Sequence, residues 1–225
     1  MNKVYLQDCN IFMKDKPDNY YDLAIVDPPY FKGPSDGGKY YKGKNNKAIC
    51  KKYKKIESWN VPDKIYFDEL FRISCNQIIW GINYYNYNFP VGRIVWIKMM
   101  KNGPFSSAEI ACCSLHKKVS IFNYLWNGFW QEDMKNKEKR IHPTQKPVAL
   151  YKWLLKNYAK PGYKLLDTHS GSGSFRIAAY DMGFDLDSCE LDKDYFDANE
   201  KRFQNHISQN ELFEKTEYQD LIYKD

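Results

Sequence analysis

The architecture of this 225-residue chain is easiest to infer from Tyr163-Lys-Leu-Leu-Asp-Thr-His-Ser-Gly-Ser-Gly-Ser-Phe175. A short apolar run, a turn with two glycines one residue apart and a helix-forming segment follow one another, which predicts strand, turn and helix. Glycines at the carboxyl end of a strand let the backbone approach a ligand closely. The stretch therefore favours an α/β protein that binds a nucleoside-containing ligand, with a plain strand-to-helix turn as the structural alternative.

Two common nucleotide-binding motifs match this turn only in part. A dinucleotide fingerprint needs a third glycine where Arg176 stands, although Glu190 lies 19 residues after Gly171, at the distance typical of a ribose-binding acid. The Lys-Ser/Thr pair of a phosphate-binding P-loop is also missing. The turn by itself thus predicts a class of ligand and leaves the identity of that ligand open.

Apolar runs and helical periodicities alternate over the rest of the chain, with Gly and Pro between them. Strands are expected at residues 4–6, 23–26, 77–80, 93–97, 119–122, 163–166 and 186–189. Helices are expected from Pro62 to about residue 73 and at residues 106–115, 147–158, 172–182 and 192–206. Strands joined by helices predict a doubly wound α/β sheet, and without an internal repeat or a second boundary, residues 1–225 are expected to form one domain.

Composition excludes several classes of protein. Hydrophobic residues make up 43% of the chain, which fits a globular fold. No run approaches the roughly 20 apolar residues of a membrane span, and the first residues lack a signal-peptide pattern. The six cysteines and four histidines do not follow zinc-site spacing. We therefore expect a cytoplasmic protein with reduced thiols, no bound metal and no membrane association.

Positive charge is concentrated in residues 31–55, where nine lysines stand against the single acid Asp36. The segment therefore carries +8, although the net charge of the whole chain is only +6. Several glycines and no apolar periodicity predict a mobile loop. The loop is either a solvated surface or a phosphate-binding surface with Tyr40, Tyr41 and Tyr53 as stacking groups.

A second motif, Ala24-Ile-Val-Asp-Pro-Pro-Tyr30, places a carboxylate at the end of an expected strand. Two prolines remove backbone donors and stiffen the turn, which leaves carbonyl oxygens available as acceptors. A carboxylate, a carbonyl and an aromatic plane suit a flat ring that carries an exocyclic amine, because the two amine hydrogens meet two acceptors while the ring stacks on Tyr30. A bare turn is the structural alternative for Asp27-Pro-Pro-Tyr30.

Three signatures occur in order along the chain: Asp27-Pro-Pro-Tyr30, His142-Pro-Thr-Gln-Lys-Pro147 and Asp167-Thr-His-Ser-Gly-Ser-Gly173. With them the chain resembles the S-adenosylmethionine-dependent DNA amino-methyltransferases of the N4/N6 family, in the group where D-P-P-Y precedes the glycine loop. The flanking segments are similar to phage and mobile-element members, so the resemblance covers nearly the whole chain except the basic loop and residues 123–139. The family loop usually reads D-P-F-x-G-x-G, so Thr168 and His169 depart from it, and no ring contact is carried over to His169.

The resemblance implies a Rossmann-like, doubly wound and mostly parallel methyltransferase sheet, with a circularly permuted motif order that puts the catalytic half first. It implies S-adenosylmethionine as the cofactor and no metal. The catalytic residues that it implies are Asp27, Pro28, Pro29 and Tyr30. The cofactor-binding residues that it implies are Asp167, Gly171 and Gly173 near the methionine part, Glu190 at the ribose hydroxyls, Asp8 and Cys9 near the adenine, and Thr144 and Lys146 near the methionine carboxylate.

The reaction expected from this resemblance is direct methyl transfer to the N6 amine of an adenine that is flipped out of double-stranded DNA. Asp27 and the Pro28 carbonyl would accept the amine hydrogens and stabilise the positive charge that develops on nitrogen. Two alternatives stay open: a cytosine-N4 methyltransferase, although that group more often has Ser in place of Asp27, and a non-catalytic nucleic-acid-binding relative.

Residues 123–140 are the least regular part of the sequence, and they contain Trp126, Phe129 and Trp130. Because they lie between the two catalytic halves, we expect them to contribute to target recognition, with a cover for the sheet edge as the alternative. The resemblance also leaves a homodimer and a partner restriction enzyme open, in a bacterial or phage-infected cell.

Overall fold

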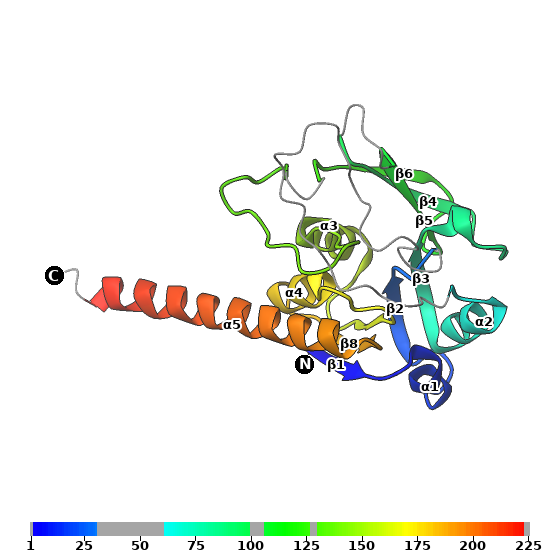
Figure 1. Ribbon diagram of the computed structural model, residues 1–225, viewed down its shortest axis with the longest axis horizontal. Coiled ribbons are helices and arrows are strands. Elements are labelled where there is room, and N and C mark those ends of the chain that lie inside the picture. Colours follow the sequence, from blue (N-terminus) through cyan, green and yellow to red (C-terminus); the bar gives the residue numbers. More distant parts are fainter. Residues whose placement is uncertain (1, 31–60, 100–105, 127–129, 223–225) are drawn as a thin grey trace.

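The computed structural model of the protein describes residues 2–30, 61–99, 106–126 and 130–222, and it describes side chains as far as residue 209 (Figure 1). The predicted basic loop, residues 31–55, lies outside the described residues, and so does Phe129. Both expectations stay predictions.

Eight strands form one sheet in the described part of the chain, in the order β1-β8-β7-β2-β3-β5-β4-β6. They are β1 (Asn2–Leu6), β2 (Tyr21–Val26), β3 (Ser74–Trp80), β4 (Gly92–Ile97), β5 (Ala108–Cys113), β6 (Val119–Asn123), β7 (Lys164–Asp167) and β8 (Asp185–Glu190). β5 runs antiparallel to both of its neighbours, and the other neighbouring pairs are parallel. The predicted α/β fold with a mostly parallel sheet is confirmed.

Helices cover both faces of the sheet (Figure 1). They are α1 (Cys9–Lys14), α2 (Lys64–Ile73), the short 3₁₀ helix η1 (Ile82–Tyr84), α3 (Val148–Tyr158), α4 (Ser174–Asp181) and α5 (Lys193–Ile222). α3 and α4 pack on one face, and α1 and α2 pack on the other. α5 begins beside β1, β8 and α4 and then extends away from the sheet (Figure 1).

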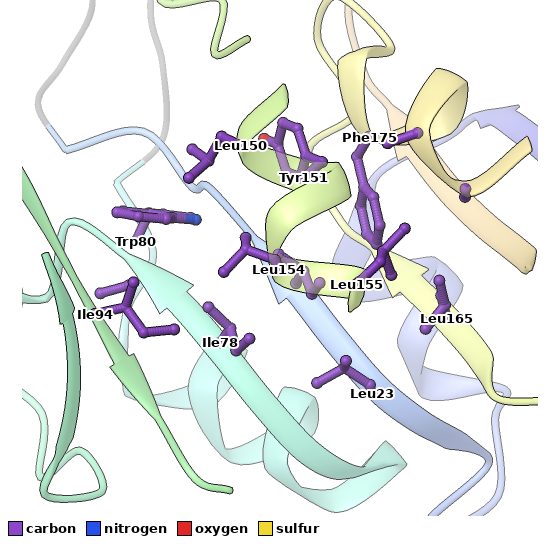
Figure 2. Packing of buried hydrophobic residues seen from close by; sticks show 14 of the residues in the cluster. Leu23, Ile78, Trp80, Ile94, Leu150, Tyr151, Leu154, Leu155, Leu165 and Phe175 are labelled. Atoms are coloured by element: carbon purple, nitrogen blue, oxygen red, sulfur yellow. The ribbon is translucent and has the colours of Figure 1, made fainter. Parts of the chain in front are cut away.

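The central strands are apolar on both sides because each side meets a helix layer. In β2, Leu23 and Ile25 face α3 and α4, whereas Ala24 and Val26 face α1 and α2. Figure 2 shows the first of these layers, in which Leu154 and Leu155 of α3 lie over Leu23, Ile78 and Leu165. Continuous burial on two faces explains why the central strands read as unbroken apolar runs.

Local sequence signals determine where several helices begin. The Asp8 carboxylate caps α1 by accepting the backbone N–H groups of Asn10 and Ile11, and Asp63, just after Pro62, caps α2 by accepting the Tyr66 N–H. These side chains satisfy amide groups that have no partner in the first turn of a helix.

The structure contradicts the expected helix at residues 106–115, which contains strand β5 instead. Ala111, Cys112 and Cys113 are fully buried where β5 inserts between β3 and β4. Small apolar residues permit either conformation, so pairing with two neighbouring strands decided the outcome. The structure also contains α1, which the periodicity of the sequence did not predict, and it continues α5 well beyond residue 206.

Two kinds of feature are absent from the described residues. No helix among them is long and apolar enough to cross a membrane. No group of three or more His, Cys, Asp or Glu side chains within those ranges could hold a metal ion.

Candidate active site

The candidate site lies where β2 and β7 run side by side and end at the same edge of the sheet. From β2 the chain continues to β3 on one side, and from β7 it continues to β8 on the other. Ligands of open α/β sheets bind at such a switch point, outside the carboxyl ends of the strands. Asp27 follows β2 and Asp167 ends β7, so the two sequence motifs meet at this edge.

The Asp27 turn is held by hydrogen bonds to its acceptors. The Tyr30 hydroxyl donates to Asp27 Oδ1 over 2.5 Å. The Tyr85 hydroxyl donates to the Pro28 and Pro29 carbonyl oxygens at 2.8 and 3.2 Å. The Pro28 carbonyl, expected as an acceptor for substrate, therefore already holds one donor, and it retains a second lone pair.

Lys146 joins this turn to a carboxylate from a different part of the sheet. Its ammonium group lies 3.0 Å from Asp27 Oδ2, and it also forms an ion pair with Glu109 Oε2. The Lys98 ammonium pairs with the other Glu109 oxygen, Oε1, over 2.5 Å. Two carboxylates and two ammonium groups thus form one cluster, hereafter the charge cluster, which consists of Asp27, Lys98, Glu109 and Lys146.

Aromatic rings surround the charge cluster. Lys146 Nζ lies 5.3 Å from the centroid of the Trp80 ring and 5.8 Å from that of Tyr30, so its charge faces two π systems. The Tyr30 ring stacks on Tyr84, with centroids 4.9 Å apart. Gly81 makes room for Tyr30, because a Cβ at this glycine would lie 2.0 Å from Tyr30 Cε1.

Burial and pairing oppose each other in setting the pKa values of the charge cluster. Burial raises the pKa of Asp27, and the nearby Lys146 ammonium opposes only part of this rise. Burial also acts to raise the pKa of Glu109, but Lys146 and Lys98 outweigh it and lower that pKa to about 2. Burial disfavours the Lys146 ammonium, but Asp27 and Glu109 outweigh it and raise its pKa. Glu109 and Lys146 are therefore charged at neutral pH.

The glycine loop is held from two sides. Glu190, at the end of β8, accepts the Gly171 N–H at 2.8 Å and the Asp192 N–H at 2.9 Å. From α5, the Asn199 side chain donates to Ser170 Oγ at 2.8 Å, and the Arg202 guanidinium donates to the Ser172 carbonyl at 2.9 Å. Side chains from β8 and α5 therefore fix the backbone between Asp167 and α4.

The structure gives a different reason for glycine at position 173 than closeness to a ligand. Gly173 has φ of +72°, and a Cβ there would lie 2.3 Å from Asn199 Oδ1. Gly171 has φ of +50°, and a Cβ there would make only ordinary van der Waals contact with the His142 ring, at 3.7 Å. Substitution of Gly173 would therefore displace Asn199 and strain the turn, whatever ligand it binds.

Thr168 and His169 replace the usual Pro and Phe of the loop, and both make polar contacts inside the protein. Thr168 Oγ1 lies 2.6 Å from the Tyr66 hydroxyl and 2.9 Å from His169 Nδ1, while His169 Nε2 lies 4.0 Å from Cys9 Sγ. Burial lowers the pKa of His169 to about 4, so the ring is neutral at pH 7. His169 is thus a hydrogen-bonded loop residue in this structure.

Asp167 is the most strongly perturbed carboxyl group of the loop. Only 4% of the residue is exposed, and burial raises its pKa to about 8, while the His169 N–H acts in the opposite direction by donating to Oδ1 over 3.0 Å. Asp27 and Glu190 raise the pKa further, because their negative charges disfavour a third one nearby. The free protein therefore keeps Asp167 largely protonated at neutral pH.

Residues 142–146 connect the two parts of the site. His142 lies beside Gly171, and Thr144 Oγ1 lies 3.1 Å from His142 Nδ1. Lys146, two residues on from Thr144, reaches Asp27 instead. The expected contact of Lys146 with a cofactor carboxylate stays a prediction, and such a carboxylate would compete with Asp27 and Glu109 for the ammonium group.

The structure thus brings the predicted site residues together in two groups and adds others. The first group contains Asp27 and Lys146, which belong to the charge cluster, and the adjoining Pro28, Pro29 and Tyr30. The second group lies in or beside the glycine loop and contains Asp167, Gly171, Gly173, Glu190, Asp8, Cys9 and Thr144. Asp8 and Cys9 belong to the start of α1, where the Asp8 carboxylate is engaged as a helix cap. Lys98, Glu109, Asn199 and Arg202 were not predicted from the sequence. An acid inside the apolar run Ala-Glu-Ile-Ala-Cys-Cys was the one available signal for Glu109.

The described part of residues 123–140 divides into an anchored and an exposed portion. Trp126 is buried in the core, and its indole N–H donates to the Gln145 carbonyl at 2.9 Å. The Trp130 residue is 55% exposed. The anchored tryptophan fits a cover for the sheet, whereas the exposed one offers a surface for a partner, so both hypotheses retain support.

Comparisons with known proteins place these features in a family. A family model described as DNA methylase matches residues 39–201. The type II methyltransferase M.HinfI of Haemophilus influenzae is 24% identical over 90% of this chain and 68% of its own length. The putative methylase YubD of Escherichia coli (strain K12) is 24% identical over 90% of each chain.

Solved structures with low sequence identity share the fold. The M1.HpyAVI-SAM complex is 21% identical with a TM-score of 0.54, and the match covers 90% of this chain and 100% of that one. The cytosine-N4-specific PvuII DNA methyltransferase is 14% identical with a TM-score of 0.57, over 89% and 86% of the two chains. With the family model matching well over half of its residues, the chain belongs to the N6/N4 DNA methylase family.

Proposed function

We propose that this protein transfers a methyl group from S-adenosylmethionine to the N6 amine of an adenine in double-stranded DNA. The observation that carries the proposal is the placement of the Asp27-Pro-Pro-Tyr30 turn and the glycine loop at adjacent strand ends of one sheet edge. An acceptor for an exocyclic amine then stands next to a loop suited to a nucleoside, as methyl transfer between the two requires.

The residues of the glycine loop fit this cofactor. Glu190 can accept from ribose hydroxyls with lone pairs that the Gly171 and Asp192 amides leave free. Gly171 has φ of +50° and lies beside the His142 ring, so a residue without a Cβ holds this turn without strain. When bound, the cofactor supplies an electrophilic methyl group on a positively charged sulfur.

Asp27 is the residue that acts on the amine. The lone pair of the amine is delocalised into the ring, so acceptors that draw its hydrogens out of the ring plane make the nitrogen more nucleophilic. The same acceptors stabilise the positive charge that grows on nitrogen as the methyl group arrives. Tyr30, hydrogen-bonded to Asp27 Oδ1, fixes the orientation of the carboxylate. Water can take the surplus proton after transfer.

Adenine is favoured over cytosine by the acid at position 27, since the N4 group of this family more often has Ser there. The charge cluster itself does not separate the two bases, because both present an amine beside a ring-nitrogen acceptor. Cytosine-N4 methylation is therefore the second candidate, and the fold likeness to a cytosine-N4-specific enzyme is in keeping with it.

DNA contacts in this proposal come from two segments. The basic segment 31–55 begins directly after Tyr30 and supplies nine lysines for phosphate binding. Residues 123–140 supply target contacts, with the exposed Trp130 as their leading candidate. Replacing Lys51, Lys52, Lys54 and Lys55 by Gln should weaken binding to all DNA sequences alike and flatten the salt dependence, by roughly one unit of slope for each phosphate that is no longer neutralised.

The experiment that tests the function is tritium transfer from labelled cofactor to DNA, followed by nucleoside analysis of the product. N6-methyladenine supports the proposal, N4-methylcytosine replaces it with the second candidate, and the absence of any labelled nucleoside contradicts both. The Asp27→Ala variant, with cofactor binding checked by calorimetry, serves as the matched negative control. Single-molecule sequencing of DNA from expressing cells would then give the methylated motif.

A further inference from the structure

With its two carboxylates and two ammonium groups ionised, the charge cluster has no net charge, and it is assembled from four separate segments. Asp27 follows β2, Lys98 follows β4, Glu109 lies in β5 and Lys146 precedes α3. The side chain of Lys146 is 3% exposed, and that of Glu109 is 18% exposed. Two acids and two bases that are removed from water together cancel one another, which limits the cost of burying them.

Lys146 is shared unequally within the cluster. Its ammonium contacts Asp27 Oδ2 at 3.0 Å and also pairs with Glu109 Oε2, and Glu109 is in turn paired with Lys98 through Oε1. Asp27 has the Tyr30 hydroxyl on its other oxygen. Glu109 therefore neutralises the larger part of the Lys146 positive charge. The negative charge of Asp27 is correspondingly less neutralised.

We propose that Glu109 is a positioning residue for methyl transfer: it holds the Lys146 ammonium so that Asp27 meets the substrate amine within a cluster of zero net charge. This inference rests on the proposed function. Glu109 would not touch the substrate and would act through Lys146 and Asp27.

The physical reason is the sign of the charge that develops during the reaction. The amine nitrogen becomes positive as the methyl group arrives, so a net positive cluster beside it would raise the barrier. Without Glu109, Lys98 and Lys146 would outnumber the single remaining acid, Asp27. Lys146 would then also pair with Asp27 alone and draw its negative charge away from the amine.

A structural role for the same residue makes a different prediction. Lys98 and Glu109 form one ion pair, so removing either member breaks the same contact and should impair the protein in the same direction. A role in charge balance predicts changes of opposite sign in the rate of methyl transfer, because Glu109→Gln makes the cluster positive whereas Lys98→Met makes it negative. The two variants therefore separate the explanations.

The test is the single-turnover rate constant of methyl transfer, measured with saturating cofactor and DNA between pH 5.5 and 9.5. Glu109→Gln should lower this constant by about 10- to 100-fold, and Lys98→Met should raise it by about two- to fivefold, as expected for one unit of charge near the reacting nitrogen. Glu109→Asp, which keeps the charge, should recover much of the loss.

The pH profile provides a second readout. The titratable groups that face Asp27 from the surrounding elements are Tyr30, Tyr85, Glu109, Lys146, Tyr151 and Asp167. The Glu109 charge raises the pKa of Asp27, so Glu109→Gln should move the acid limb of the profile to lower pH while the plateau falls. Loss of folding alone would lower the plateau without this shift.

Asp181→Asn is the matched control, because Asp181 is another poorly exposed acid that pairs with two bases, Lys152 and His206, at the far end of α4. It should leave the rate constant unchanged. Equal losses in Glu109→Gln and Lys98→Met, or an unmoved acid limb, would overturn the inference. If Glu109→Gln shows no cooperative thermal transition and therefore does not fold, the Lys98→Met variant decides. A lower rate constant in Lys98→Met would then be enough to overturn the inference. An inactive wild-type protein would instead count against the proposed function.

Discussion

The charge cluster and the glycine loop lie at neighbouring strand ends, yet they are constructed in opposite ways. The loop presents backbone from one continuous segment, and Glu190, Asn199 and Arg202 hold it by hydrogen bonds. The charge cluster consists of side chains from four segments, held by ion pairs. A backbone site depends on conformation, whereas a side-chain site depends on charge balance, so substitutions should affect the two in different ways.

The largest effect is expected in the charge cluster. Asp27→Ala should lower the rate of methyl transfer by a factor on the order of 100 to 1000, as loss of one preorganised acceptor or donor does in other enzymes. Calorimetry should show that cofactor binding persists, because the glycine loop is intact. Near-normal turnover in this variant would contradict the assignment of catalysis to the charge cluster and of cofactor binding to the glycine loop.

A second substitution in the charge cluster, Lys146→Met, should mainly lower the stability of the fold. Lys146→Met leaves Asp27 and Glu109 without their shared partner, so the free energy of unfolding in urea should fall by about 2–4 kcal/mol. Lys146 lowers the pKa of Asp27, so the acid limb of any residual activity should move to higher pH. Lys193→Met, in an exposed i,i+4 pair with Asp197, is the control and should cost little. If both variants lost the same free energy of unfolding, burial of the Lys146 ion pairs would not explain the loss in Lys146→Met.

In the glycine loop, Asp167→Asn should increase stability while it reduces cofactor affinity. The pKa of Asp167 is raised from 3.8 to about 8, so the wild-type fold loses stability as pH rises from about 4 to 8. Asn has no charge to bury, so its advantage in unfolding free energy should grow by about 2–4 kcal/mol between pH 5 and pH 8.5. A pH-independent difference between the two proteins would rule out this explanation.

The smallest effect is expected from the support of the loop. Asn199→Ala removes the hydrogen bond to Ser170 Oγ and opens space beside Gly173. Cofactor affinity should fall by roughly tenfold, as expected when one hydrogen bond that orders the loop is lost. The rate at saturating cofactor should change little. Calorimetry and saturation kinetics measure the two quantities, and a fall in rate at saturation would mean that the loop also positions the reacting atoms.

Contiguous features of the molecule could be predicted from the sequence. The strand, glycine turn and helix of residues 163–175 form from neighbouring residues, and so do the Asp27 turn, the start of α2 just after Pro62 and the apolar strands β2 and β3. In each of them the constraint is local: a missing Cβ, a missing N–H or the periodicity of apolar side chains. The order of the three signatures then identified the family.

The tertiary structure alone decided what depends on contacts between distant segments. Residues 106–115 contain strand β5 because β3 and β4 offer unpaired edges to it, and this brings Glu109 within ion-pair distance of Lys98 and Lys146. Gly173 is required because Asn199, 26 residues later in the sequence, fills the space that a Cβ would need. Ion pairing and close packing act over ångströms and are independent of separation along the chain, so the partners of Asp27 and Gly173 became apparent only in the folded protein.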